Sequence, residues 1–259
     1  MKIRVLLNNN FDESQYISYF ENSVCLVIDT LRATSTIATI FGRGAEKIMI
    51  SQSKNEAFRL KEEFKDYILC GEEKGIKIEG FDYDNSPFTI SMLDLKGKSA
   101  ILKTTNGTLS FIKARSARIV FALSILNLNH TMDCALKFAE KENTDITILC
   151  SGKLGKNSYD DAFTAGFAIK HLLRKHKKSN QELEMDDNAT LVLNAALNEK
   201  NIFKALMNSI SGKCALKLGA INDIYFSSEL DKYNKTGKLD IVSYSEDLKN
   251  LYILNSYIA

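Results

Sequence analysis

The residues best suited to chemistry follow an apolar run at residues 24–28. A continuous apolar stretch suits a strand of a parallel sheet that is covered on both faces. The next segment predicts a helix with Thr34 or Ser35 as its N-cap. Asp29 and Arg32 therefore fall in a strand-to-helix turn, where open α/β sheets bind ligands. A carboxylate, a guanidinium and free N–H groups suit a metal ion with a phosphorylated substrate, although an Asp–Arg pair also serves simply to hold a turn.

A second polar segment follows a strand that is predicted to end at residue 70. Glu72 lies at this strand end, and the adjacent Lys74 is either a functional cation or a solvated loop charge. Further along stand Asn85, Ser86 and Pro87, the only proline of the chain. Proline suits the first position of a helix, with Asn85 or Ser86 as its cap, so a purely structural role explains this motif as well as ligand binding does.

A third polar segment, residues 104–108, follows another predicted strand. It carries the hydroxyls of Thr104, Thr105 and Thr108, the amide of Asn106, and Gly107. We expect Gly107 to permit a positive φ, so that successive N–H groups form a concavity that binds a phosphate. The alternative is an Asx-type turn with a threonine cap.

A fourth polar segment begins at Ser151 and Gly152 and ends in two adjacent acids. It lacks the spacing of a phosphate-binding Walker A loop. Ser158 and Asp161 have the spacing of a capping box, which explains one carboxylate but not both. Asp160 and Asp161 are therefore candidates for a metal ligand or a base.

Strand-like and helix-like runs alternate through the first two thirds of the chain. This alternation predicts an α/β fold with three α/β/α layers and a mostly parallel, possibly mixed, sheet. Beyond a polar connection at residues 175–187 we expect two helices, a short strand at residues 223–226, and an aliphatic tail at residues 239–259 that docks on the body. The whole chain, residues 1–259, is interpreted as one domain with a smaller C-terminal subdomain from about residue 180.

Composition narrows the class of protein. The 259 residues include 34 basic and 32 acidic side chains, a balance that argues against a nucleic-acid surface. No apolar stretch approaches the roughly 20 residues that span a bilayer, and the start of the chain turns polar too soon for a signal peptide. The five cysteines show no CxxC spacing, which favours buried free thiols and a reducing compartment. We therefore expect a cytoplasmic protein without nucleic-acid or membrane partners; a homo-oligomer remains compatible with the sequence.

The four polar segments together resemble the 2-phosphosulfolactate phosphatase family, magnesium-dependent enzymes of coenzyme M biosynthesis. The resemblance is carried by Asp29-Thr-Leu-Arg-Ala-Thr-Ser-Thr36, Gly71-Glu72, Gly80-Phe-Asp82, Asn85-Ser-Pro87, Thr104-Thr-Asn-Gly-Thr108, Cys150-Ser-Gly152, Asp160-Asp161 and Gly219 to Tyr225. It spans almost the whole chain. The sequence departs from the family in one place: Glu73 follows Gly71-Glu72, where the family often has arginine. The neighbouring Lys74 would supply the positive charge of that arginine, but as a point charge that lacks the bidentate fork of a guanidinium.

The resemblance implies hydrolysis of 2-phospho-3-sulfolactate to 3-sulfolactate and phosphate with Mg²⁺ as the cofactor. Asp29, Glu72 and Asp161 would be the metal ligands, and Asp29, Arg32 and Asp161 the catalytic residues. The expected substrate-binding residues are Lys74, Asn85, Ser86, Thr104, Thr105, Asn106, Gly107, Thr108, Ser151 and Gly152. We favour attack by metal-activated water, because the second acid of a haloacid-dehalogenase motif is replaced by Leu31.

Two alternatives retain the same fold. One is a phosphatase for another small phosphorylated hydroxy acid, and the other is a non-catalytic protein that binds a phosphorylated metabolite. A dinucleotide-binding domain is disfavoured, because no G-x-G-x-x-G motif opens any of the expected helices.

Overall fold

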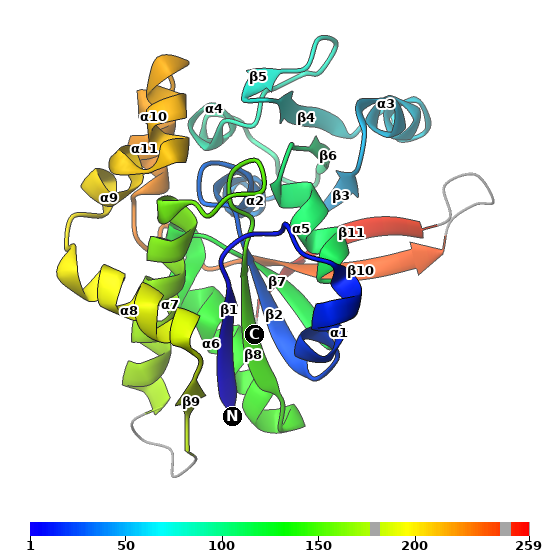
Figure 1. Ribbon diagram of the computed structural model, residues 1–259. Coiled ribbons are helices and arrows are strands. Elements are labelled where there is room, and N and C mark those ends of the chain that lie inside the picture. Colours follow the sequence, from blue (N-terminus) through cyan, green and yellow to red (C-terminus); the bar gives the residue numbers. More distant parts are fainter. Residues whose placement is uncertain (177–181, 244–249, 259) are drawn as a thin grey trace.

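The computed structural model describes residues 1–176, 182–243 and 250–258 (Figure 1). Its strands are β1 Lys2–Leu6, β2 Ser23–Ile28, β3 Lys47–Ser51, β4 Ile68–Glu73, β5 Ile76–Lys77, β6 Ser99–Lys103, β7 Ile119–Leu123, β8 Asp145–Cys150, β9 Glu184–Met185, β10 Thr236–Ser243 and β11 Asn250–Tyr257. Its helices are α1 Glu13–Glu21, α2 Ala33–Gly42, α3 Lys54–Glu63, α4 Pro87–Ser91, α5 Gly107–Lys113, the 3₁₀ turn η1 Ile125–Asn127, α6 Leu128–Glu142, α7 Tyr159–His176, α8 Asp187–Asn198, α9 Ile202–Asn208, α10 Ile210–Lys217 and α11 Ile221–Ser227.

One mixed sheet runs through the described residues in the strand order β5-β4-β6-β3-β11-β10-β7-β2-β8-β1-β9. Two groups of parallel strands make up most of it, namely β7-β2-β8-β1-β9 and β4-β6-β3. The antiparallel hairpin β10–β11 joins the two groups, and it lies across the direction of β1, β2 and β8 (Figure 1). The predicted α/β class with a mostly parallel, mixed sheet is confirmed.

Strand β2 shows why this sheet needs helices on both faces. Val24, Leu26 and Ile28 pack in one cluster with side chains of α6 and α7. The intervening Cys25 and Val27 pack in another cluster, with side chains of α2 and α5. Successive side chains of a strand point to opposite faces, so a strand that is covered twice must be apolar throughout. The uninterrupted run at residues 24–28 is therefore explained by its place at the centre of three layers.

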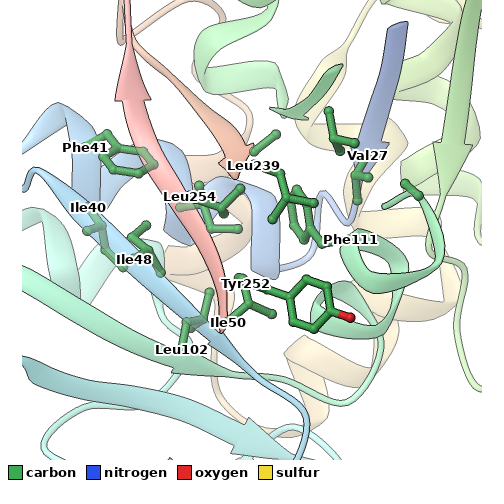
Figure 2. Packing of buried hydrophobic residues seen from close by; sticks show 14 of the residues in the cluster. Val27, Ile40, Phe41, Ile48, Ile50, Leu102, Phe111, Leu239, Tyr252 and Leu254 are labelled. Atoms are coloured by element: carbon green, nitrogen blue, oxygen red, sulfur yellow. The ribbon is translucent and has the colours of Figure 1, made fainter. Parts of the chain in front are cut away.

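The aliphatic tail docks on the body as expected, but it does so by forming the hairpin β10–β11 inside the sheet. Leu239 of β10 lies opposite Leu254 of β11. Both belong to the cluster that contains Phe41, Ile48 and Tyr252 (Figure 2). The hairpin thus closes the core between the two parallel groups. Part of the predicted tail, residues 244–249 and 259, lies outside the described residues, as do residues 177–181 of the predicted polar connection.

The C-terminal helices α9, α10 and α11 cover the turn that follows β2. Leu206, Ala215 and Ile224, one from each helix, pack with Leu31 of that turn. The short strand expected at residues 223–226 is wrong, because this segment belongs to α11. Its Ile-Tyr-Phe sequence favours a strand, but α11 buries one helical face, and tertiary packing overrides the local preference.

Two smaller features complete the fold. All five cysteines are free thiols, and four of them are buried. In the part of the chain that the structure describes, none of the helices combines the length and the apolar character that a membrane span requires.

Candidate active site

Asp29 begins the site, at the end of β2. Its side-chain Oδ1 accepts the N–H of Ala33 at 3.3 Å, and its backbone carbonyl accepts the N–H of Thr34 at 2.9 Å. Helix α2 begins at Ala33 with Arg32 at the N-cap position, and no Arg32 side-chain bond caps the helix. The predicted hydroxyl caps are therefore wrong. Thr34 instead accepts the N–H of Asp29 at 3.1 Å, and the acid itself receives the first N–H groups of the helix.

Gly107 places the 104–108 segment against Asp29. A Cβ atom at this position would lie 2.5 Å from Cβ of Ala33 and 2.9 Å from Oδ2 of Asp29. The expected positive φ is wrong, since Gly107 is not among the residues with that conformation in the described chain. What the glycine provides is close approach of α5 to the turn after β2. Two segments that are far apart in sequence therefore meet at one carboxylate.

Asp161 joins the turn after β2 to the turn after β8. Its Oδ1 accepts the N–H of Thr30 at 2.8 Å, and its Oδ2 accepts the N–H of Gly152 at 2.9 Å. The capping-box interpretation with Ser158 is not what the structure shows, because the Ser158 hydroxyl donates to Asp160 instead. Both oxygens of Asp161 thus hold backbone from two neighbouring loops.

Glu72 plays the same role for the other group of strands. Its Oε1 accepts the N–H of Thr105 at 2.6 Å, and its Oε2 accepts the Thr105 hydroxyl at 3.0 Å and the N–H of Gly75. Lys74 has a positive φ and donates its N–H to the Thr105 hydroxyl at 3.0 Å. The loops after β4 and β6 are therefore fastened together beside the Gly107 contact with Asp29.

Three buried acids, Asp29, Asp160 and Asp161, form a carboxylate cluster. Burial raises the pKa of Asp29 to about 7, and repulsion from Asp160 adds to the shift. Burial likewise raises the pKa of Asp161 well above its usual value, helped by repulsion from Asp160 and Asp29. The pKa of Asp160 is raised by burial, although hydrogen bonds from serine hydroxyls oppose the shift. Ionising these acids is costly because they are buried and their negative charges repel one another. A bound cation would lower that cost.

This cluster offers oxygen ligands, the kind that Mg²⁺ takes. Within the described ranges, however, no three His, Cys, Asp or Glu side chains are arranged as a ready-made metal site. Both carboxylate oxygens of Glu72 and of Asp161 already accept backbone N–H groups. Asp29 accepts a single N–H at 3.3 Å, so it is the acid with the most free coordination capacity. The residues present fit an ion that takes one or two carboxylates and completes its shell with water and substrate oxygens.

Arg32 is held by acids from two distant segments. Its Nη1 donates to Asp223 of α11 at 2.8 Å and to Asp84 at 3.4 Å, and its Nη2 donates to the Gly75 carbonyl at 3.1 Å. Asp223 also accepts the Ser86 hydroxyl at 2.5 Å and the N–H of Phe88 at 3.2 Å. Asp223 therefore connects α11 to the turn after β2 and to the start of α4.

The Asn-Ser-Pro motif follows its structural interpretation in part. Ser86 caps α4 by accepting the N–H of Thr89 at 3.0 Å, with Pro87 at the start of the helix. The neighbouring Asn85 is buried, and its side-chain Oδ1 has no hydrogen-bond donor among the described residues. An unpaired buried amide oxygen is costly, so Asn85 remains available for a ligand or water.

A pocket of about 230 Å³ opens beside these loops. Its lining comes from the turns at the strand ends and from α10: Leu31, Arg32, Lys74, Gly75, Thr105, Asn106, Lys153, Leu154, Ser211, Cys214, Ala215 and Leu218. Of the predicted substrate-binding residues, Lys74, Thr105 and Asn106 are in this lining, together with the predicted catalytic Arg32. Sequence reasoning did not select Lys153, although its positive charge acts on Asp29.

Other predicted substrate-binding residues are not in this lining, and they hold the loops instead. Thr104 Oγ1 accepts the N–H of Thr108 at 3.1 Å, and the Thr108 hydroxyl donates to the Thr104 carbonyl at 2.9 Å. Ser151 shares a hydrogen bond of 2.8 Å with Ser110, and Gly152 donates to Asp161. Asp223 and Lys153 are the site residues that sequence reasoning missed. The only signal for Asp223 was its place in the late segment of the family resemblance.

Comparison with known proteins identifies the family of this chain. Residues 12–240 match the family model described as 2-phosphosulpholactate phosphatase. A relative from Carboxydothermus hydrogenoformans is 38% identical over 211 residues, which cover 82% of this chain and 84% of the relative. Another, from Caldanaerobacter subterraneus subsp. tengcongensis, is 36% identical over 228 residues, or 86% of this chain and 90% of the relative. Both are named "Probable 2-phosphosulfolactate phosphatase". The chain belongs to the 2-phosphosulpholactate phosphatase family and is thus a phosphoric monoester hydrolase.

Proposed function

We propose that this enzyme is a magnesium-dependent phosphatase that hydrolyses 2-phospho-3-sulfolactate to 3-sulfolactate and phosphate. The observation that carries the proposal is the meeting of four strand-end loops at one place. Asp161 and Glu72 fasten these loops in two pairs, and the contact of Gly107 with Asp29 joins the pairs. The names of the relatives supply the substrate, and the cations of the pocket suit an anionic ester.

Lys74, Lys153 and Arg32 would receive the acidic groups of the substrate. All three line the pocket, and they come from the loops after β4, β8 and β2. The ammonium groups act as point charges, whereas the guanidinium presents a planar fork that orients a phosphate or sulfonate. Charge that develops on the transferring phosphoryl oxygens would be stabilised by these fixed donors.

Asp29 would hold Mg²⁺, together with water and a substrate oxygen. Glu72 and Asp161, the other ligands expected from the sequence, would contribute as neighbouring negative charges, because their oxygens are occupied by backbone N–H groups. When bound, the ion would neutralise phosphoryl oxygens and lower the pKa of a bound water molecule. The alternative of a covalent phosphoaspartate is disfavoured, since Leu31 occupies the position of the second acid that such a mechanism uses.

The proposal is tested by a phosphate-release assay across 2-phospho-3-sulfolactate, 2-phospholactate and the phosphoglycerates, each with Mg²⁺ and with excess chelator. We expect turnover of 2-phospho-3-sulfolactate that depends on Mg²⁺. Tight binding of this ester without phosphate release would contradict the proposal and would indicate a metabolite-binding protein instead.

A further inference from the structure

The polar side chains that line the pocket are mostly hydrogen-bond donors. Arg32, Lys74 and Lys153 carry N–H groups and no acceptor. Thr105 gives its hydroxyl proton to Glu72 at 3.0 Å and accepts the backbone N–H of Lys74 at 3.0 Å. These groups suit an anionic ester. A water molecule that attacks phosphorus has a different need, because it turns a lone pair towards phosphorus and its two protons then require acceptors.

Ser211 of α10 supplies such an acceptor. It is 5% exposed and lines the pocket. Its hydroxyl lies 3.0 Å from the hydroxyl of Ser158, and Ser158 donates to Asp160. A hydroxyl has one proton and two lone pairs, so Ser158 can only accept from Ser211. The proton of Ser211 therefore points towards Ser158, which lies outside the lining and is 1% exposed, and its lone pairs remain for the pocket.

Ser211, Ser158 and Asp160 thus form a directed hydroxyl chain, and its inner end reaches the carboxylate cluster. The negative charge of Asp160 acts on Asp29 across that cluster. The backbone carbonyl of Asp160 accepts the Thr164 hydroxyl at 2.9 Å, and Thr164 shares a hydrogen bond of 2.8 Å with Thr30. Thr30 and Asp29 belong to the same turn. The hydroxyl chain therefore ties the pocket side of α10 to the turn that carries Asp29.

We propose that Ser211 is a further catalytic residue, whose hydroxyl oxygen accepts a hydrogen bond from the attacking water while Ser158 and Asp160 hold it in that orientation. The inference rests on the proposed attack by water. In this step the water oxygen forms a bond to phosphorus, and the ester oxygen leaves with the electron pair of the broken P–O bond. One water proton stays on the phosphate, and the other passes through solvent to the leaving oxygen. Ser211 keeps its own proton throughout.

Ser211→Ala tests the acceptor directly. With 2-phospho-3-sulfolactate and Mg²⁺, we expect kcat to fall at least about tenfold, the scale of one hydrogen bond made to the reacting water. KM should change less than about twofold, because the serine touches the water and not the ester. A normal kcat, or a loss that appears only in KM, would overturn the inference.

Ser209→Ala is the matched control at the same end of α10. Ser209 is also 1% exposed, but it lies outside the pocket lining. It caps the helix by accepting the N–H of Gly212 at 2.8 Å, and its hydroxyl donates to the Leu206 carbonyl at 2.8 Å. We expect this variant to lower the melting temperature and to leave kcat near normal. Equal losses of kcat in Ser209→Ala and Ser211→Ala would assign the effect to the placement of α10 and overturn the inference.

Ser158→Ala tests the positioning role within the hydroxyl chain. It leaves Ser211 in place but removes the group that receives its proton, so the Ser211 hydroxyl is free to turn. We expect a smaller loss of kcat than in Ser211→Ala, and almost no further loss when Ser158→Ala is added to Ser211→Ala. Fully additive losses would contradict a shared role.

A second ester separates a role at the water from a role at the leaving oxygen, and it also separates this inference from the proposed function. The nitrophenolate of 4-nitrophenyl phosphate leaves without a proton, so a residue that acts on the leaving oxygen loses its effect with this ester. We expect Ser211→Ala to lower kcat by the same factor with both esters, and a loss confined to 2-phospho-3-sulfolactate would overturn the inference. Wild-type turnover of 4-nitrophenyl phosphate alone would contradict the proposed substrate, while the comparison of Ser211→Ala with wild type on that ester would still decide the role of Ser211.

Discussion

Asp29 and Asp161 lie in the same carboxylate cluster but make different hydrogen bonds. Both are buried, at 8% and 2% exposure, and burial raises the pKa of both. Asp161 receives two backbone N–H groups from two loops at 2.8 and 2.9 Å. Asp29 receives one, from its own turn, at 3.3 Å. Asp161 therefore holds the loops of the site in place, whereas Asp29 keeps carboxylate lone pairs free to bind an ion or substrate.

The largest expected effect is on catalysis by Asp29→Asn. The amide keeps the size of the side chain but removes the negative charge that would hold Mg²⁺. We expect kcat to fall about 10³-fold, within the range for groups that act directly in the chemical step. The melting temperature should stay the same or rise, because the substitution removes a buried acid whose raised pKa marks a destabilising environment. Steady-state kinetics and thermal unfolding at pH 8 measure the two effects.

Asp161→Asn is the matched substitution, and its largest effect should be on stability. One of the N–H groups of Thr30 and Gly152 would face the amide nitrogen and lose its acceptor. An unsatisfied buried donor costs about 1–3 kcal/mol. Both substitutions remove a buried acid whose pKa is raised, so we expect Asp161→Asn to be less stable than Asp29→Asn by an amount in that range. Chemical denaturation of both variants makes the comparison. An Asp161→Asn variant as stable as Asp29→Asn would contradict the building role.

Arg32→Lys tests whether the guanidinium clamps the substrate or only holds the turn. Lysine keeps the charge and an ion pair with Asp223 but loses the bidentate fork. We expect at least a tenfold loss in kcat/KM, or about 1.4 kcal/mol, with little change in melting temperature. Near-normal kinetics with a clearly lower melting temperature would assign Arg32 to the fold alone.

Asp223→Asn extends this test through a double-mutant cycle. If Asp223 positions Arg32, the single substitution should reproduce part of the loss in kcat/KM, and it should cost less in the Arg32→Lys background than in the wild type. Asp84→Asn is the control, because Asp84 lies farther from Arg32, at 3.4 Å against 2.8 Å. Fully additive losses would indicate that Asp223 acts independently of Arg32.

The smallest effect concerns pH. Asp29 has a pKa of about 7 in the folded protein, above the 3.8 of an unperturbed carboxyl. Between these values the folded state holds a proton that the unfolded state has lost, so stability falls as the pH rises towards 7. We expect a loss of about 1 kcal/mol between pH 6 and pH 7 in chelator, and a smaller loss in Asp29→Asn. Identical pH profiles for the two proteins would contradict the raised pKa.

Sequence patterns identify the central strand and the acids that follow it for a physical reason. A strand that is buried on both faces must be apolar, and its carboxyl end meets the ends of its parallel neighbours. This reasoning leads to Asp29 and Glu72 before any coordinates are known. The choice of Asp161 over its neighbour Asp160 came with the family resemblance. Neither argument distinguishes Asp161 from Asp29, because the backbone partners of Asp161 come from two other loops.

The features that the sequence did not predict depend on contacts between residues that lie far apart in the chain. The close approach of Gly107 to Asp29 is visible only when α5 and α2 are placed side by side. Asp223 was missed because its segment was expected to form a strand, and its partner Arg32 is nearly 200 residues away. The hairpin β10–β11 was expected only as a docked tail, because its pairing with β3 and β7 is a tertiary choice.

The most direct test of the account is phosphate release from 2-phospho-3-sulfolactate by the wild type and Asp29→Asn, first in excess chelator and then after Mg²⁺ is restored. We expect chelation to abolish wild-type turnover, Mg²⁺ to restore it, and Asp29→Asn to show almost no turnover in either condition while remaining folded. Full wild-type turnover in chelator, or recovery of Asp29→Asn to the wild-type rate by Mg²⁺, would contradict a metal-dependent site at Asp29.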